Sequence, residues 1–233
     1  MGFAPAADFA PIPARKKQMI RFHPYSFSAL WILCLIGAVS GCRTLPESEN
    51  ALHRAGLVEI KSVIPDIVLD IRYATPDNFT GRAVYPSARC FLTRDAVHAL
   101  RAVQQDLRAE GYGLKIFDGY RPLSVQRRFW AIKPDPNFVA DPAKGSRHNK
   151  GYAVDLSLVD LSGKEVAMPT PFDDFTERAH PDYDGPDLPP DARRHRALLR
   201  SVMEQHGFTV FPTEWWHYDF KGWEDRKSTR LNS

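Results

Sequence analysis

Two short polar segments, far apart in the chain, place the strongest constraint on how it can fold. Residues 146–155 read SRHNKGYAVD and contain His148 and Asp155, and residues 214–217 read EWWH and end on His217. Zinc accepts imidazole nitrogen and carboxylate oxygen as ligands, and a catalytic zinc site typically uses three protein ligands and leaves its fourth position open for water. His148 and Asp155 supply two such ligands, and His217 is the candidate for the third. A fold that uses this chemistry must bring the two segments together.

Glu214 is the second chemically active residue of the EWWH segment. Side chains alternate between the two faces of a regular strand, so Glu214 and His217 would point to opposite faces. Both can reach one site only if the strand bends or bulges near Glu214, and Pro212 just upstream favours such an irregularity. In that arrangement His217 binds the metal, and Glu214 stays free to accept a proton from the attacking water and pass it to the leaving amine.

A third polar segment, residues 118–122 (DGYRP), offers a fixed positive charge. Attack on an amide places negative charge on the former carbonyl oxygen, and a guanidinium aimed at that oxygen stabilises the transition state more than the ground state. Arg121, held at a predicted strand end between Gly119 and Pro122, is the candidate for this role. Taken alone, Arg121 could instead be a solvated cation or a partner of Asp118.

The metal-site residues also have a plain structural interpretation. Taken singly, His148 reads as a surface-loop histidine and Asp155 as a carboxylate at a strand edge, because most such residues are solvated. Their joint occurrence with EWWH and GYRP in one chain favours the metal site.

In combination these segments resemble a known family. SRHNKGYAVD resembles the SxHxxGxAxD motif of the zinc D-Ala-D-Ala peptidases, EWWH resembles their ExWH motif, and DGYRP matches their arginine segment. Within that superfamily the chain is most similar to the VanX-type D-alanyl-D-alanine dipeptidases, over residues 57–223. This closer likeness is carried by residues 73–75 (YAT), 78–82 (NFTGR), Met168, 172–173 (FD) and 177–180 (ERAH).

The resemblance implies an activity, a cofactor and a set of residue roles. The activity is zinc-dependent hydrolysis of the D-alanyl-D-alanine dipeptide to two D-alanines in cell-wall peptide metabolism, with one zinc ion per chain. The implied roles are zinc ligation by His148, Asp155 and His217, base catalysis by Glu214, transition-state stabilisation by Arg121, and substrate binding by Ser146 and Asp173. Asp173 would receive the free ammonium of the dipeptide, because burying that ammonium unpaired would be costly.

Two other functions stay open from the sequence. A D,D-carboxypeptidase acting on longer peptidoglycan stems would keep the same metal site, and a noncatalytic zinc-containing module that binds cell-wall peptide would need only the ligands. Glu214 argues against the binding module, because binding needs no proton shuttle. The formal net charge of +3, with cationic residues spread along the chain, argues against a nucleic-acid partner.

The N-terminal residues predict export and anchoring. Cationic residues precede an apolar run at residues 29–39 (ALWILCLIGAV), which is short for a membrane-spanning helix and suits the hydrophobic region of a signal peptide. The run leads into VSGC, which resembles a bacterial lipobox and makes Cys42 the expected lipidated residue; a retained transmembrane anchor is the alternative. We expect a lipoprotein-type signal peptide over 1–41, a tether over 42–56, a zinc peptidase domain over 57–223 on the periplasmic face of the cell envelope, and a disordered tail over 224–233.

The order of the expected elements predicts an α+β domain. Hydrophobic periodicity and the positions of glycine and proline predict strands at 67–72, 113–118, 154–160 and 214–220, and helices between Thr93 and Gly111, at 123–132 and at 191–206. These elements do not alternate regularly, so we expect a central, mostly antiparallel sheet flanked by helices, and the resemblance implies a Hedgehog/DD-peptidase-like fold. Apart from the lipidated Cys42, only Cys90 remains in the expected mature chain, so packing rather than a disulfide must stabilise it.

Overall fold

The computed structural model describes residues 47–224. The expected signal peptide, Cys42 and residues 225–233 of the expected tail lie outside this range. The helices are α1 (Glu47–Arg54), α2 (Ile60–Val63), α3 (Arg94–Ala109), α4 (Leu123–Ile132) and α5 (Pro190–Gln205). The strands are β1 (Leu57–Glu59), β2 (Val68–Leu69), β3 (Phe91–Thr93), β4 (Tyr112–Asp118), β5 (Ala153–Asp160), β6 (Phe208–Phe211) and β7 (Glu214–Phe220).

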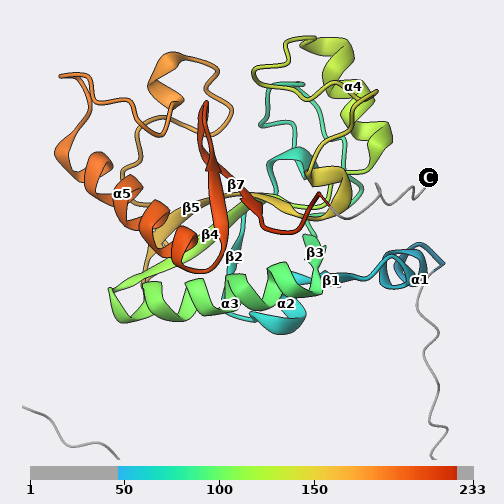
Figure 1. Cartoon of the computed structure of the whole chain (residues 1–233), viewed down its shortest axis with the longest axis horizontal. Helices are drawn as coiled ribbons and strands as arrows, with labels where there is room; N and C mark the ends of the chain where they lie inside the picture. Colours follow the sequence, from blue (N-terminus) through green and yellow to red (C-terminus); the bar gives the residue numbers. More distant parts are fainter. Residues whose placement is uncertain (1–46, 225–233) are drawn as a thin grey trace, which may run out of the picture. The chain divides into compact units, whose positions relative to one another are not determined.

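The central sheet has five strands in the order β2-β4-β5-β7-β6 (Figure 1). The pairs β4–β5, β5–β7 and β7–β6 are antiparallel, whereas β2 pairs parallel to β4. A separate two-stranded antiparallel ladder joins β1 to β3. The predicted α+β class with a mostly antiparallel sheet is therefore confirmed.

Helices α3 and α5 pack side by side against one face of this sheet (Figure 1). Apolar side chains that alternate along the strands point toward them, such as Leu114 and Ile116 of β4 and Leu156 of β5, which have no exposed surface. The residues between these positions project to the other face. That other face carries the polar side chains described below.

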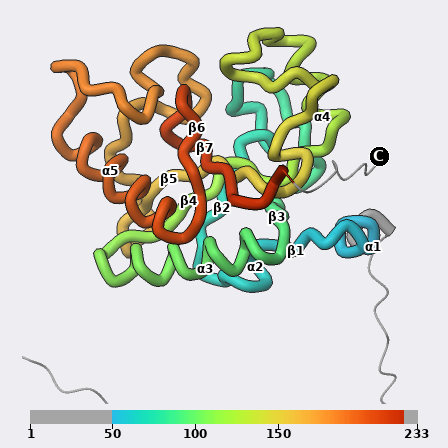
Figure 2. The backbone as a smooth tube through the Cα atoms, in the orientation of Figure 1, coloured from blue at the N-terminus to red at the C-terminus, as the bar shows by residue number. Residues whose placement is uncertain are grey.

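A second, smaller hydrophobic cluster forms away from α3 and α5. It joins Tyr73, from the short 3-10 turn η1 (Arg72–Ala74), to Val125 and Phe129 of α4 and to Val139 of the following loop. Figure 2 shows α4 and the chain around η1 on one side of the sheet, with α3 on the other. This cluster supports the loops that surround the polar face.

The structure adds α2, β1, β3 and β6 to the expected elements and differs from them in two further places. Helix α1 lies within residues 42–56, the expected tether, so part of that segment is helical. The strand expected at 67–72 is reduced to β2, because only Val68 and Leu69 find partners on β4 before the chain turns into η1. None of the helices between residues 47 and 224 is long and apolar enough to cross a membrane.

Candidate active site

Asp155 and His217 come from neighbouring strands of the central sheet. Asp155 of β5 is paired directly with His217 of β7 across the antiparallel ladder. Paired residues project to the same face, with Cβ atoms about 4.5–5.5 Å apart. Their neighbours Val154 and Tyr218 belong to the core packed under the helices, so alternation turns Asp155 and His217 to the opposite face. Strand register thus brings the two side chains together.

His148 reaches the same place from a loop. It begins the 3-10 turn η2 (His148–Lys150), which ends at Gly151 with φ 73°. A Cβ on Gly151 would lie 2.4 Å from Leu57 Cδ2, so close packing as well as the backbone conformation requires glycine here. The ring Nδ1 of His148 donates to the carbonyl oxygen of Gly119 at 2.8 Å, which aims Nε2 at the two strands.

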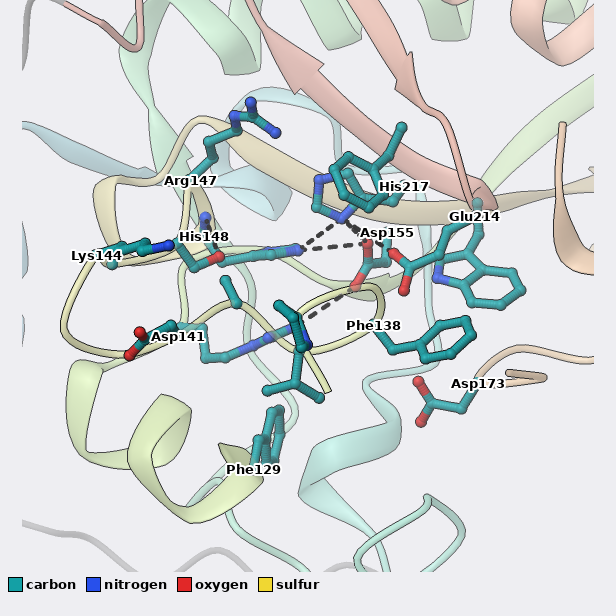
Figure 3. A pocket seen from close by; sticks show the side chains of 18 of the residues that line it. Phe129, Phe138, Asp141, Lys144, Arg147, His148, Asp155, Asp173, Glu214 and His217 are labelled. Atoms are coloured by element: carbon teal, nitrogen blue, oxygen red, sulfur yellow. Dashed lines mark hydrogen bonds and ion pairs between the residues drawn. The ribbon is translucent and has the colours of Figure 1, made fainter. Parts of the chain in front are cut away.

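The three side chains direct one ligand atom each toward a common point (Figure 3). His148 Nε2 lies 3.2 Å from His217 Nδ1 and 3.4 Å from Asp155 Oδ1. His217 Nδ1 lies 3.0 Å from Asp155 Oδ1. Ligand atoms at about 2.1 Å from a tetrahedral zinc ion stand about 3.4 Å apart. The predicted ligand residues therefore form a buried cluster with spacings that suit a zinc ion.

The hydrogen bonds around the cluster also fit a cation. Because His148 Nδ1 donates to Gly119, its Nε2 carries a lone pair. His217 Nε2 lies 3.1 Å from Asp219 Oδ1 and can donate a hydrogen bond to it, which in a neutral His217 leaves the lone pair on Nδ1. Asp155 Oδ1 is buried and has no hydrogen-bond partner among the described residues. When both histidines are neutral, two lone pairs and a carboxylate oxygen this close repel one another unless a cation lies between them.

The electrostatics of the cluster point the same way. Burial would raise the pKa of Asp155, but His148 and His217 hold it well below its ordinary value. Burial would lower the pKa of His217, but Asp219 and Asp155 raise it instead. The cluster therefore keeps its carboxylate ionised and favours positive charge beside it.

Glu214 reaches the cluster because β7 is irregular, as expected from the sequence. Strand β6 pairs Val210 with Tyr218 but Phe211 with Glu214, so the ladder shifts between these pairs. As a result Glu214 Oε2 lies 3.7 Å from His217 Nδ1. Burial raises the pKa of Glu214 to about 8, against an opposing effect of His217. A carboxyl group that titrates near neutral pH is suited to accept a proton and return it.

Arg121 borders the cluster and is held from several sides. Its Nε and one terminal nitrogen contact Asp118 Oδ2 at 2.9 and 2.8 Å, and the other terminal nitrogen donates to Gln126 Oε1 at 3.0 Å. The guanidinium also lies 3.7 Å from Asp155 Oδ2 and over the ring of Phe129. Burial would lower the pKa of Arg121, but Asp118 keeps it well above its ordinary value. Arg121 therefore pairs with Asp118 and also presents a fixed charge to the site.

Asp173 and Ser146, the predicted substrate-binding residues, both border the same cavity. The Asp173 carboxylate points into it (Figure 3), and the hydroxyl of Tyr73 donates to its two oxygens at 3.0 and 3.3 Å. Burial raises the pKa of Asp173 to about 7 although the Tyr73 hydrogen bond opposes this. Ser146 Oγ accepts the backbone N–H of His148 at 3.2 Å, so Ser146 also supports the histidine loop.

The cavity has a volume of about 450 Å³ and opens on the ligand cluster. Aromatic side chains form much of its wall: Phe79, Phe138, Phe175, Phe211 and Trp216. Small-molecule sites commonly combine an apolar wall with a few convergent polar groups and fall in this size range. A dipeptide fits such a cavity.

Sequence reasoning missed several residues that hold the site in place. Tyr73 supports the Asp173 carboxylate, and Asn149 Nδ2 donates to the carbonyl oxygen of Arg121 at 2.7 Å. Neither contact has a local sequence signal, because the partners are far apart in the chain. Asp219 did have a local sequence signal. It follows His217 by two positions in a strand, and residues at that spacing share a face.

Comparisons with known proteins found sequence matches to one family of peptidases. A family model described as "D-ala-D-ala dipeptidase" matches residues 53–228. A D-alanyl-D-alanine dipeptidase of Escherichia coli is 40% identical over 163 residues, which are 70% of this chain and 83% of that protein. A D-alanyl-D-alanine dipeptidase of Enterococcus faecium is 33% identical over 184 residues, covering 70% of this chain and 90% of that protein.

Two solved structures of other peptidases share less sequence identity with this chain. The D,D-pentapeptidase VanY in complex with Zn(II) has a TM-score of 0.39 and 17% identity, over 58% of this chain and 75% of that one. The LD-carboxypeptidase LdcB has a TM-score of 0.42 and 19% identity, over 73% of this chain and 70% of that one. Family membership therefore rests on the sequence matches.

Proposed function

This chain belongs to the D-Ala-D-Ala dipeptidase family, and from that membership we propose that its candidate active site hydrolyses D-alanyl-D-alanine to two D-alanines with one zinc ion as cofactor. The metallopeptidase class follows from the family. The zinc ion and the residue roles are supported above all by one observation: the ligand atoms of His148, Asp155 and His217 lie 3.0–3.4 Å apart in a buried cluster.

The residues around the cluster can carry the proton and charge changes of amide hydrolysis. A bound zinc ion would polarise the scissile carbonyl and lower the pKa of water at the site. Glu214, beside His217, takes the proton of the attacking water and delivers it to the amine that leaves. Arg121 stabilises the negative charge on the carbonyl oxygen, and because Asp118 and Gln126 already fix its guanidinium, this needs little reorganisation.

Asp173 is the residue that favours a free dipeptide over a longer peptide. A substrate ammonium beside this buried carboxylate would form a charge-assisted pair and favour its ionised form. A longer stem has an uncharged amide at the same position and would leave the carboxylate unpaired. Ser146, next to the histidine loop, is proposed to contact the substrate near the metal.

Metal content and hydrolysis, measured together, test the proposal. The purified domain should contain one zinc ion per chain and release D-alanine from D-alanyl-D-alanine, and Glu214→Gln should keep the zinc and lose turnover. Protein that binds zinc but hydrolyses no D,D-dipeptide, with Glu214→Gln indistinguishable from wild type, would instead support a noncatalytic binding module.

Substrate length distinguishes the dipeptidase from a D,D-carboxypeptidase. The free dipeptide should be hydrolysed much faster than N-acetyl-D-alanyl-D-alanine, which lacks the ammonium, and than a pentapeptide stem ending in D-Ala-D-Ala. Equal rates on the stem and the dipeptide would contradict the role of Asp173 and the dipeptidase assignment.

We also propose that the protein is a lipoprotein on the periplasmic face of the cell envelope. The support is the apolar run at residues 29–39 followed by VSGC. In cells fed radiolabelled palmitate, the wild-type chain should be labelled and found in membranes, and Cys42→Ser should lose the label. Membrane retention of an unlabelled, uncleaved chain would favour the transmembrane anchor.

A further inference from the structure

His217 can bind a metal through Nδ1 only if its other ring nitrogen keeps the proton. A neutral imidazole carries one N–H, and the hydrogen bond made by that N–H decides which nitrogen stays free for a metal. The acceptor beside Nε2 is Asp219, whose Oδ1 lies 3.1 Å away. Asp219 therefore occupies the position that selects the metal-binding form of His217.

The backbone places Asp219 at this point by strand geometry. It follows His217 by two positions in β7 and so lies on the same face of the sheet. Its pairing with Ala153 of β5 on one side and Thr209 of β6 on the other fixes its register. Asp219 is 9% exposed, so water competes little for its carboxylate.

Arg147 holds the second oxygen of the same carboxylate. Its NH1 lies 2.8 Å from Asp219 Oδ2, and its guanidinium stacks 4.4 Å from the centre of the Trp223 ring. Arg147 directly precedes His148 in the chain. The ion pair therefore ties the loop that carries one ligand to the strand that carries another.

We propose that Asp219, fixed by Arg147, is a positioning residue that accepts a hydrogen bond from the Nε2–H of His217, keeps the proton on Nε2 and so leaves Nδ1 free to bind the metal ion. This inference rests on the proposed metal site and adds to it a chain of contacts, Arg147–Asp219–His217, behind the ligands. Partners of this kind typically contribute about 10–100-fold to metal affinity.

Competition for zinc tests this without any measurement of turnover. Zinc-loaded protein is titrated with a chromophoric chelator, and the zinc transferred gives the dissociation constant. Asp219→Asn should bind zinc about 10–100-fold more weakly, because His217 and Arg147 contact different oxygens of Asp219 and asparagine has an acceptor oxygen at only one of these two positions. Arg147→Met should weaken binding less, because Asp219 keeps its bond to His217, and Arg147→Lys should restore part of the loss.

Lys150→Met is the matched control. Lys150 also lies over the Trp223 ring, at 5.1 Å, and donates to the carbonyl oxygen of Trp223. It precedes Gly151 on the same loop but forms no described contact with Asp219. Lys150→Met should bind zinc as tightly as wild type within about twofold, well below the effect expected for Asp219→Asn.

A spectroscopic measurement on the wild-type protein covers the case in which a variant does not fold. Nitrogen-15 spectra of the zinc-loaded protein should show His217 protonated at Nε2 and coordinated through Nδ1. Coordination through Nε2 would overturn the inference.

The outcomes separate this inference from the proposed function. Wild-type protein that binds no zinc would contradict the metal site and the inference together. Wild-type protein that binds zinc, with Asp219→Asn folded and equally tight, would leave the proposed function intact and overturn the role of Asp219. Equal losses of melting temperature in Asp219→Asn and Arg147→Met with unchanged zinc affinity would mark the pair as a structural tie only.

Discussion

Replacing Asp173 by asparagine should stabilise the protein, and increasingly so as the pH rises. Burial raises the pKa of Asp173 to about 7, from an ordinary value of 3.8. The folded state therefore keeps a proton that the unfolded chain has already lost. This carboxyl contributes stability that is fully present below pH 3.8 and is lost as the pH rises through about 7.

The size of the effect follows from the two pKa values. Their separation corresponds to about 4 kcal/mol at about 1.4 kcal/mol for each pKa unit, and about 3 kcal/mol of this develops between pH 5 and pH 8. Asparagine has no charge to bury, so its variant escapes this loss. Asparagine also tolerates the left-handed backbone of this position, where Asp173 has φ 63°. Backbone strain should therefore not mask the electrostatic gain.

Urea unfolding at pH 5 and pH 8 measures this gain. Metal-free protein is used because metal binding itself depends on pH, and the difference between variant and wild type cancels the titrations that both share. The free energy of unfolding of Asp173→Asn minus that of wild type should increase by about 3 kcal/mol between the two pH values. Asp174→Asn removes a carboxylate from the same loop and controls for net charge.

Tyr73→Phe gives a second, directional check. The Tyr73 hydroxyl donates to the Asp173 carboxylate and lowers its pKa. Its removal should raise the pKa of Asp173 further and move the loss of stability to higher pH. A variant-minus-wild-type difference for Asp173→Asn that stays constant from pH 5 to pH 8 would refute the reasoning that burial of this carboxyl outweighs its hydrogen bond from Tyr73.

The remaining predictions concern catalysis and metal binding. Asp173→Asn should lose most kcat/KM on D-alanyl-D-alanine, because it removes the carboxylate proposed to pair with the substrate ammonium; unchanged kcat/KM in that variant would argue against the pairing. Arg121→Ala should keep zinc, by elemental analysis, and lose turnover about 100–1000-fold; loss of zinc would contradict its assigned role. His217→Ala should lose zinc and activity together, and full zinc content in that variant would remove His217 from the ligand set. Chelator treatment should abolish hydrolysis and added zinc should restore it, whereas activity that survives full metal removal would contradict a metal-dependent reaction.

Local sequence patterns were enough to predict several helices and strands and the types of residue in the site. Helix α4 and strand β7 have the predicted bounds, because their proline breaks and hydrophobic periodicity are local properties of the chain. The irregular pairing at Glu214 was also predictable, since its spacing from His217 is incompatible with a shared face in a regular strand.

Other features could not be predicted from local sequence patterns. The helix within residues 42–56 spans only Glu47–Arg54, with Ala51 and Leu52 as its apolar residues, and the strand expected at 67–72 shortened to two paired residues. Short elements such as these depend on partners elsewhere in the fold. The same holds for Tyr73, which meets Asp173 only after the chain has folded.

The sequence by itself determined the chemistry of this protein: which imidazoles, carboxylates and guanidinium are present, and the motif spacing that identifies the family. Only the tertiary structure decided how these groups act. The register that pairs β5 with β7 sets the distance between Asp155 and His217, and burial sets the pKa values of Glu214 and Asp173. Distance and solvation arise from residues that are far apart in the chain, so local sequence patterns do not contain them.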